Sequence, residues 1–271
     1  MPPGDPIDPR ALLRPGCLAH LEHLAETGST MDRARELGTG VPLPAAVVAD
    51  VQVAGRGRSA ARWWQPPGSL AVSIVIDASP GSDAGPAKPA WSLACGIALV
   101  ETLRDLVPGV ATLVRWPNDI EVGGRKLAGI LVESSGCETA AARVIFGVGV
   151  NTTGTAADAP GRLAHRVATI PDLTGAPLGR QHLLTQFVPR LRSLLAALTR
   201  GDDRLVDRYA PVCGLTGREV TLYSGRDVHV GTCLGVTDEG AIVLATAGGT
   251  RAFRSGSLTR PGDEWRGAGA N

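Results

Sequence analysis

The chain contains almost no lysine. Among its 27 basic residues only Lys88 and Lys126 are lysines. Since arginine is the usual basic residue of this chain, each lysine suggests a role for which an ammonium group is needed. The formal net charge of +1 gives no bulk electrostatic basis for binding nucleic acid or a membrane surface. At about 100–200 residues per domain, a length of 271 residues predicts one or two domains.

Metal-binding, disulfide and targeting signals are also missing. The five cysteines are widely spaced, odd in number and without a CxxC motif, which argues against a disulfide framework and a structural zinc site. His20 and His23 could share a helical face, but without a third ligand nearby a structural role is favoured. The N-terminal segment lacks the basic and apolar regions of a signal peptide, and no apolar run reaches the ~18 residues of a membrane span. We therefore expect a cytoplasmic protein with no nucleic-acid or membrane partner.

Apolar periodicity predicts an α+β chain. Helices are expected over 29–37, 91–107 and 180–200, with Ser29 or Thr30 capping the first of them. Strands are expected over 45–53, 70–77 and 142–150, and a hairpin turns at Gly123-Gly124. After Tyr209 the pattern changes to short strands separated by turns, which is typical of a small β-barrel. The predicted domains are therefore residues 1–210 and 211–271.

A glycine- and arginine-rich loop follows the strand at 45–53. Its residues 55–60 fit the G-x-G-x-x-G/A pattern, but two tryptophans, a glutamine and two prolines follow where a dinucleotide site needs a helix. The loop instead suits closure over an anion, because Arg56 and Arg58 carry forked donors and Trp63 can stack on a planar base. A solvated surface loop is the alternative interpretation.

A second candidate cluster covers residues 115–133. Lys126 begins an otherwise apolar strand, where a lysine either extends its amine to solvent or meets an anion such as phosphate. Asn118 and Asp119 precede the hairpin, and turn formation explains them as well as chemistry does.

Together these segments resemble the biotin protein ligase family. The matching stretches are GSTMDRA (28–34), VQVAGRGRSAARWWQPPGSL (51–70), VRWPNDIEVGGRKLAGILVES (114–134) and FGVGVNTT (146–153). They occur in the family's order and cover most of residues 28–153. The resemblance implies a catalytic domain like that of class II aminoacyl-tRNA synthetases, with a mixed β-sheet flanked by helices. A small SH3-like β-barrel is expected to follow it.

The resemblance also implies a reaction and a role for each matched residue. The family activates biotin with ATP and Mg²⁺ as biotinyl-5′-AMP and transfers it to a lysine of a biotin carboxyl carrier protein. The residues implied to bind biotin are Ser29, Thr30, Gln52, Gly55, Arg56, Gly57, Arg58, Lys126 and Gly129. Those implied on the adenylate side are Trp63, Asn118, Asp119 and Asn151. Lys126, Arg56, Arg58 and Asp119 are the expected catalytic residues, with Asp119 also placing Mg²⁺.

The chain departs from the family pattern in three places. Met31 stands where asparagine is frequent, Ala61 where arginine is usual, and Arg115 where lysine is common. The first two put a polar contact and the tightness of adenylate retention in question, whereas Arg115 keeps the charge.

Two alternatives remain open. A lipoate ligase shares the fold superfamily, although the GRGR loop and the RWPND and RKLAGILVE stretches favour biotin. A non-enzymatic biotin-binding regulator would not need Lys126 or Asn118. Some relatives carry an N-terminal helix-turn-helix domain, but only 27 residues precede Gly28, so a monofunctional enzyme without that domain is expected.

Overall fold

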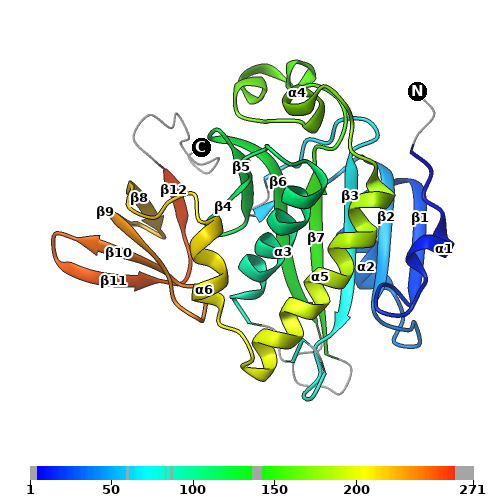
Figure 1. The fold of residues 1–271 in the computed structure, drawn as a ribbon, viewed down its shortest axis with the longest axis horizontal. Helices are drawn as coiled ribbons and strands as arrows, with labels where there is room; N and C mark the ends of the chain where they lie inside the picture. Colours follow the sequence, from blue (N-terminus) through cyan, green and yellow to red (C-terminus); the bar gives the residue numbers. More distant parts are fainter. Residues whose placement is uncertain (1–4, 59–60, 83, 86–87, 136–141, 260–271) are drawn as a thin grey trace.

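A seven-stranded mixed sheet forms the centre of the molecule (Figure 1). The structure is a computed structural model and describes residues 5–58, 61–82, 84–85, 88–135 and 142–259. The strand order is β1-β2-β3-β7-β6-β5-β4, with β1 and β2 parallel and the other neighbours antiparallel. The strands are β1 (His20–Thr27), β2 (Ala45–Gln52), β3 (Leu70–Asp77), β4 (Leu113–Arg115), β5 (Asp119–Val122), β6 (Arg125–Ser135) and β7 (Arg143–Val150).

Two long helices, α3 (Trp91–Leu106) and α5 (Arg180–Arg200), cover the face of the sheet that Figure 1 presents. The shorter helices are α1 (Pro9–Leu12), α2 (Thr30–Glu36), α4 (Ile170–Thr174) and α6 (Leu205–Tyr209). Single 3₁₀ turns occur at η2 (Ala156–Asp158), η3 (Gly161–His165) and η4 (Ala210–Val212). The predicted helices, strands and Gly123-Gly124 hairpin are confirmed, as is the mixed sheet flanked by helices.

Strand alternation gives the sheet two different faces. On β3, Leu70, Val72 and Ile74 belong to the large apolar cluster that includes α3 and α5. Val75 belongs to a smaller cluster on the opposite face, with Met31 of α2. Successive strand residues point to opposite faces, so the small cluster and α2 lie behind the sheet in the view of Figure 1. This second face is thinly covered and leaves room for a site.

A five-stranded antiparallel sheet follows, in the order β11-β10-β9-β8-β12. Its strands are β8 (Glu219–Ser224), β9 (Asp227–Val236), β10 (Ile242–Thr246), β11 (Gly249–Phe253) and β12 (Ser257–Thr259). This confirms the predicted small β domain. The Trp116 indole N–H donates to the carbonyl of Gly240 at 3.0 Å, and an Arg115 guanidinium nitrogen donates to the carbonyl of Leu258 at 2.7 Å. Residues 115–116, just before β5, are thus hydrogen-bonded directly to the small domain.

None of the helices within the described residues is long and apolar enough to cross a bilayer. Four cysteines are free thiols, namely Cys17, Cys95, Cys213 and Cys233, and Cys137 lies outside the described residues. His23 bonds Asp50 through Nε2 at 2.8 Å, and His20 lies 3.7 Å from Glu22, which fits structural roles for both histidines.

Candidate functional site

A patch of bare backbone lies on the α2 face, where β3, β7 and β6 run side by side. Gly149 of β7 pairs with Ala71 of β3 on one side and with Gly129 of β6 on the other. Two residues earlier on β7, Gly147 pairs with Ser73 of β3. Directly paired residues point to the same face, so these five small residues form a shallow basin, which we call the glycine floor. The missing side chains leave room for a flat ligand against the sheet.

Trp63 lies on the glycine floor. A Cβ atom added to Gly149 would stand 2.5 Å from the Trp63 ring carbons Cε2 and Cζ2, and one added to Gly129 would stand 3.1 Å from Cζ3. A Cβ on Gly147 would meet the sulfur of Met31 at 2.6 Å. A side chain at Gly147 or Gly149 would therefore force Met31 or Trp63 to shift, whereas at Gly129 the fit is tight without being closed. The Trp63 indole N–H is buried without a hydrogen-bond partner, an unfavourable state that makes the ring easier to displace.

The loop that carries Trp63 folds back on itself. Trp63 donates its N–H to the carbonyl of Gly55 at 2.9 Å, and Gly57 donates to the carbonyl of Ala61 at 2.7 Å. No helix occurs over residues 61–69, so the glycine pattern is not a dinucleotide fingerprint, as the sequence predicted. The structure therefore presents the loop as a flap over the glycine floor.

The two loop arginines point to different places. Arg56 donates to Asp32 of α2 at 2.6 Å and is exposed. Arg58 is half-buried, with its guanidinium nitrogens 3.4 Å from the Asn118 side-chain oxygen and 3.3 Å from the carbonyl of Gly256 in the small domain. Burial lowers the pKa of Arg58, and the negative charge of Asp119 opposes that shift. Arg58 is thus the loop cation already held in the site.

Lys126 and Asp119 form an ion pair at one end of the floor. The ammonium nitrogen lies 2.7 Å from an Asp119 carboxylate oxygen and 5.5 Å from the centroid of the Trp63 ring. Both side chains are about one-third exposed. Lys126 therefore meets an anion rather than extending into solvent, and an incoming anionic ligand would compete with Asp119 for it.

Thr30, Gln52 and Ser73 form a polar end to the floor. The Gln52 side-chain oxygen accepts from the Thr30 N–H at 2.9 Å and from its hydroxyl at 3.1 Å. The buried Ser73 hydroxyl donates to the Thr30 hydroxyl at 2.8 Å. Ser29 takes the expected N-cap position of α2, but its side chain makes no cap bond, and the Thr30 hydroxyl bonds Gln52 of β2 and Ser73 of β3 instead.

Two asparagines lie at strand ends near this face. Asn118 donates its amide N–H to the carbonyl of Ile130 at 2.7 Å, which fixes its oxygen toward Arg58. Asn151 is buried and donates to the carbonyl of Ala168 at 2.9 Å, while its side-chain oxygen has no partner. An unpaired buried acceptor is costly, which makes that oxygen a candidate for ligand contact.

The structure brings most of the sequence-predicted residues together. Contacts through Trp63 and Arg58 link Gly55, Asn118, Asp119, Lys126 and Gly129, whereas Arg56 is turned toward α2. Sequence reasoning missed Ser73 and the floor role of Gly147 and Gly149. The available signal was two glycines at alternate positions of one buried strand, which marks a face where something approaches the backbone closely.

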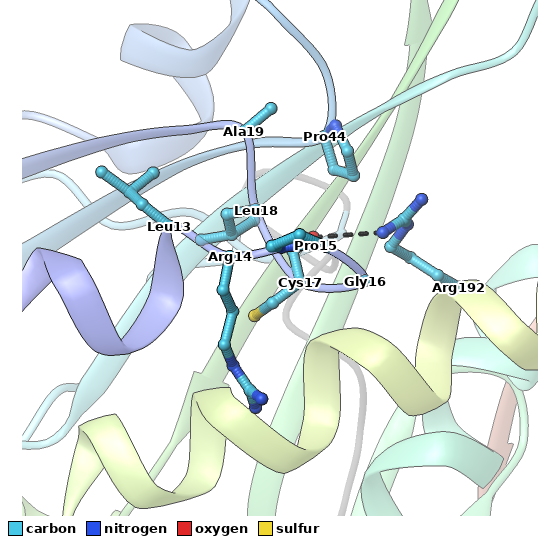
Figure 2. Close-up of a pocket in the computed structure, with 9 residues that line it drawn as sticks. All are labelled: Leu13, Arg14, Pro15, Gly16, Cys17, Leu18, Ala19, Pro44 and Arg192. Carbon is cyan, nitrogen blue, oxygen red and sulfur yellow. Dashed lines mark hydrogen bonds between the residues drawn. The ribbon is translucent and has the colours of Figure 1, made fainter.

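Two hollows in the surface lie apart from the glycine floor. One, of about 400 Å³, lies between the segment after α1 and helix α5, and Figure 2 shows Arg192 donating to the carbonyl of Cys17 across it. Burial raises the pKa of the Cys17 thiol, so the thiol is not a ready nucleophile. The other hollow, of about 280 Å³, is lined by the ion-paired Glu101, Arg190 and Arg208. The floor itself is filled by Trp63 and Met31.

Comparison with known proteins places the chain in a family. Residues 27–151 match the Biotin/lipoate A/B protein ligase family, and residues 215–257 match the Biotin protein ligase C terminal domain. A biotin–[acetyl-CoA-carboxylase] ligase of Paracoccus denitrificans is 31% identical over 227 residues, spanning 82% of this chain and 92% of the relative. The chain belongs to the biotin protein ligase family.

Further relatives agree with this assignment. A bifunctional ligase/repressor of Bacillus subtilis is 30% identical to this chain over 246 residues, covering 88% of the chain and 73% of the relative. A solved biotin protein ligase of Aquifex aeolicus in complex with biotin and ATP superposes with a TM-score of 0.77 at 25% identity. That superposition covers 89% of this chain and 99% of the other.

Proposed function

We propose that this biotin protein ligase binds biotin along the glycine floor, with ATP at the Lys126 end. The enzyme forms biotinyl-5′-AMP from biotin and ATP and then transfers biotin to a lysine of its acceptor. The supporting observation is the order of chemical groups along the floor. Hydrogen-bonding groups lie at the Thr30 and Gln52 end, bare backbone lies in the middle, and a cation lies at the far end. Biotin has the same order of parts, namely a urea head, a middle part made of a saturated sulfur ring and an aliphatic chain, and a carboxylate tail.

Binding along the floor requires Trp63 to rise. Its ring occupies the space above Gly149 and Gly129, so biotin enters beneath it and the loop closes again over the ligand. The buried indole N–H has no hydrogen-bond partner, which destabilises the position of the Trp63 ring on the floor in the ligand-free enzyme. We place the adenine side of the nucleotide at Trp63, Asn118 and Asn151, and Ser29, Gly55 and Gly57 among the backbone and side-chain contacts to biotin.

The first step joins two anions. A biotin carboxylate oxygen attacks the α-phosphorus, the bond from that phosphorus to the bridging oxygen breaks, and pyrophosphate leaves with the electron pair. Lys126 and Arg58 are placed to neutralise the carboxylate and the phosphate oxygens, and Arg56 joins them on loop closure. No protein nucleophile is needed.

The donor set fits a magnesium ion that arrives with the nucleotide. No group of three or more His, Cys, Asp or Glu side chains suited to a metal occurs among the described residues. Asp119 offers a single carboxylate beside Asn118, and Mg²⁺ is usually held by one or two carboxylates together with substrate phosphates. Asp119 would hold it, and the ion would supply positive charge to the phosphate oxygens.

The second step forms an amide. The neutral amine of the acceptor lysine attacks the biotinyl carbonyl, AMP leaves, and a proton departs from nitrogen. We propose Asp119 as the acceptor of that proton, since it faces Lys126 at the end of the floor where the carboxyl carbon lies. The acceptor is a biotin carboxyl carrier domain of a carboxylase.

We expect Asp119→Asn to slow transfer from preformed biotinyl-5′-AMP by about 10²–10⁴-fold. The asparagine is isosteric but cannot take the proton. Mixing the variant with purified adenylate and a carrier domain in a quenched-flow experiment measures transfer alone, without ATP or Mg²⁺. Transfer at the wild-type rate would remove the base role from Asp119 and leave it only a place in the first step.

The chain divides at the change to short strands, and we propose domains at residues 1–210 and 211–271. The small domain reaches the site through the contact between Arg58 and Gly256. It therefore contributes to the shape of the nucleotide end.

The activity is tested with purified protein, biotin, Mg²⁺ and ATP labelled at the α-phosphate, with lipoate in a parallel reaction. We expect labelled biotinyl-5′-AMP, and labelled product with lipoate at the background level. Product only with lipoate would assign the chain to the lipoate branch, and product with neither would indicate a binding protein.

A further inference from the structure

Gln65 lies just after the two tryptophans of the loop, and its amide has one permitted orientation. Its amide nitrogen lies 3.1 Å from the carbonyl oxygen of Asp50 and 3.1 Å from that of Ser69. Backbone carbonyls can only accept, so both amide hydrogens of Gln65 are used on them. The side-chain oxygen of Gln65 is thereby turned the other way, toward the amide nitrogen of Gln52 at 3.4 Å.

Gln52 is constrained from its other side by a group that can only donate. The Thr30 backbone N–H points at the Gln52 side-chain oxygen at 2.9 Å. If the Gln52 amide were reversed, its NH₂ group would face this N–H and its oxygen would face the oxygen of Gln65. Both contacts would become repulsive, so Thr30 and Gln65 together select one orientation.

The chain of bonds also determines what the polar end offers to a ligand. The Thr30 hydroxyl donates to Gln52 and accepts from Ser73, which leaves it one lone pair. The Gln52 amide nitrogen gives one hydrogen to Gln65 and keeps one. A free acceptor and a free donor are thus held side by side, and a cyclic urea carries the complementary N–H and C=O.

We propose that Gln65 is a positioning residue that fixes the amide of Gln52 and so sets the affinity for the urea head of biotin. This inference rests on the proposed biotin site. Gln65 reaches Gln52 from outside the ligand-contacting set, and its two anchors are backbone atoms at the ends of β2 and the loop. It acts by keeping Gln52 in its binding orientation before biotin arrives, which lowers the cost of ordering the site.

The test is the Gln65→Leu variant, which keeps the approximate size and removes every hydrogen bond. We expect the KM for biotin in adenylate formation to rise about 2- to 10-fold, the range for one lost hydrogen bond, while kcat and the KM for ATP stay within twofold. In a Gln52→Leu background the same change should have no further effect, because its target is gone. Gln186→Leu on α5, whose amide bonds the exposed His182, is the matched control and should change nothing.

Three results would overturn the inference. The first is an unchanged KM for biotin in Gln65→Leu. The second is an equal rise in that KM whether Gln52 is present or replaced by leucine. The third is a fall in kcat together with a rise in the KM for both biotin and ATP and a lowered Tm. The last result would mean that Gln65 merely holds the loop in place. The wild-type enzyme distinguishes failure of this inference from failure of the proposed function. If the wild type forms no adenylate that depends on biotin, the proposed biotin site is wrong, whatever Gln65 does.

Discussion

Replacing Lys126 with alanine is expected to lower the rate of biotinyl-5′-AMP formation by about 10²–10³-fold, the usual cost of removing one charged donor from a developing oxyanion. The ammonium lies at the end of the glycine floor, 2.7 Å from Asp119, and Lys88 is the only other lysine in the sequence. Its loss also leaves Asp119 without its counter-ion, so like charges then face the biotin carboxylate and the phosphate. The measurement is the initial rate with α-labelled ATP at saturating biotin.

The chain offers a matched control in its second lysine. Lys88 lies three residues before α3, with its ammonium nitrogen 5.2 Å from the centroid of the Trp91 ring. Lys88→Ala removes an identical group from elsewhere in the protein and should leave the rate within twofold. A loss smaller than tenfold in Lys126→Ala, or an equal loss in Lys88→Ala, would contradict the role given to Lys126.

A methyl group on the glycine floor is expected to weaken biotin binding strongly. In Gly149→Ala the new Cβ occupies the surface on which we propose that biotin rests. Its 2.5 Å approach to two ring carbons of Trp63 is relieved when that ring rises, so the cost that remains in the complex is overpacking against biotin. Overpacking of this kind costs about 1–3 kcal/mol, equivalent to about a 5- to 150-fold rise in the Kd for biotin. Isothermal titration with biotin alone measures the effect without the chemical steps.

Gly38→Ala provides the comparison for that substitution. A Cβ at Gly38 meets nothing within 4 Å, so the same chemical change away from the floor should leave the Kd for biotin unaltered. A far-ultraviolet circular dichroism spectrum and Tm for both variants would show that each is folded. If folded Gly149→Ala binds biotin as the wild type does, biotin does not lie against β7.

Local sequence was enough to predict the elements of this protein. The apolar spacing of residues 91–107 and the glycine pair at 123–124 specified a helix and a hairpin because each depends on neighbours a few residues away. Local sequence did not, however, predict the side-chain bonds at the start of α2. Ser29 and Thr30 have the composition of a cap, but the Thr30 hydroxyl bonds Gln52 and Ser73, which are distant in sequence.

The sequence by itself determined which chemical groups the site could use: the lone lysine of a strand, the loop arginines, the tryptophans and the Asn118-Asp119 pair. Only the tertiary structure decided that Gly129, Gly147 and Gly149 form one surface beneath Trp63 and that Gln65 orients Gln52. The physical reason is strand order, since β3, β7 and β6 are neighbours only after the sheet has formed. Register then brings Ala71, Gly149 and Gly129 into one row, and no local pattern along the chain encodes that alignment.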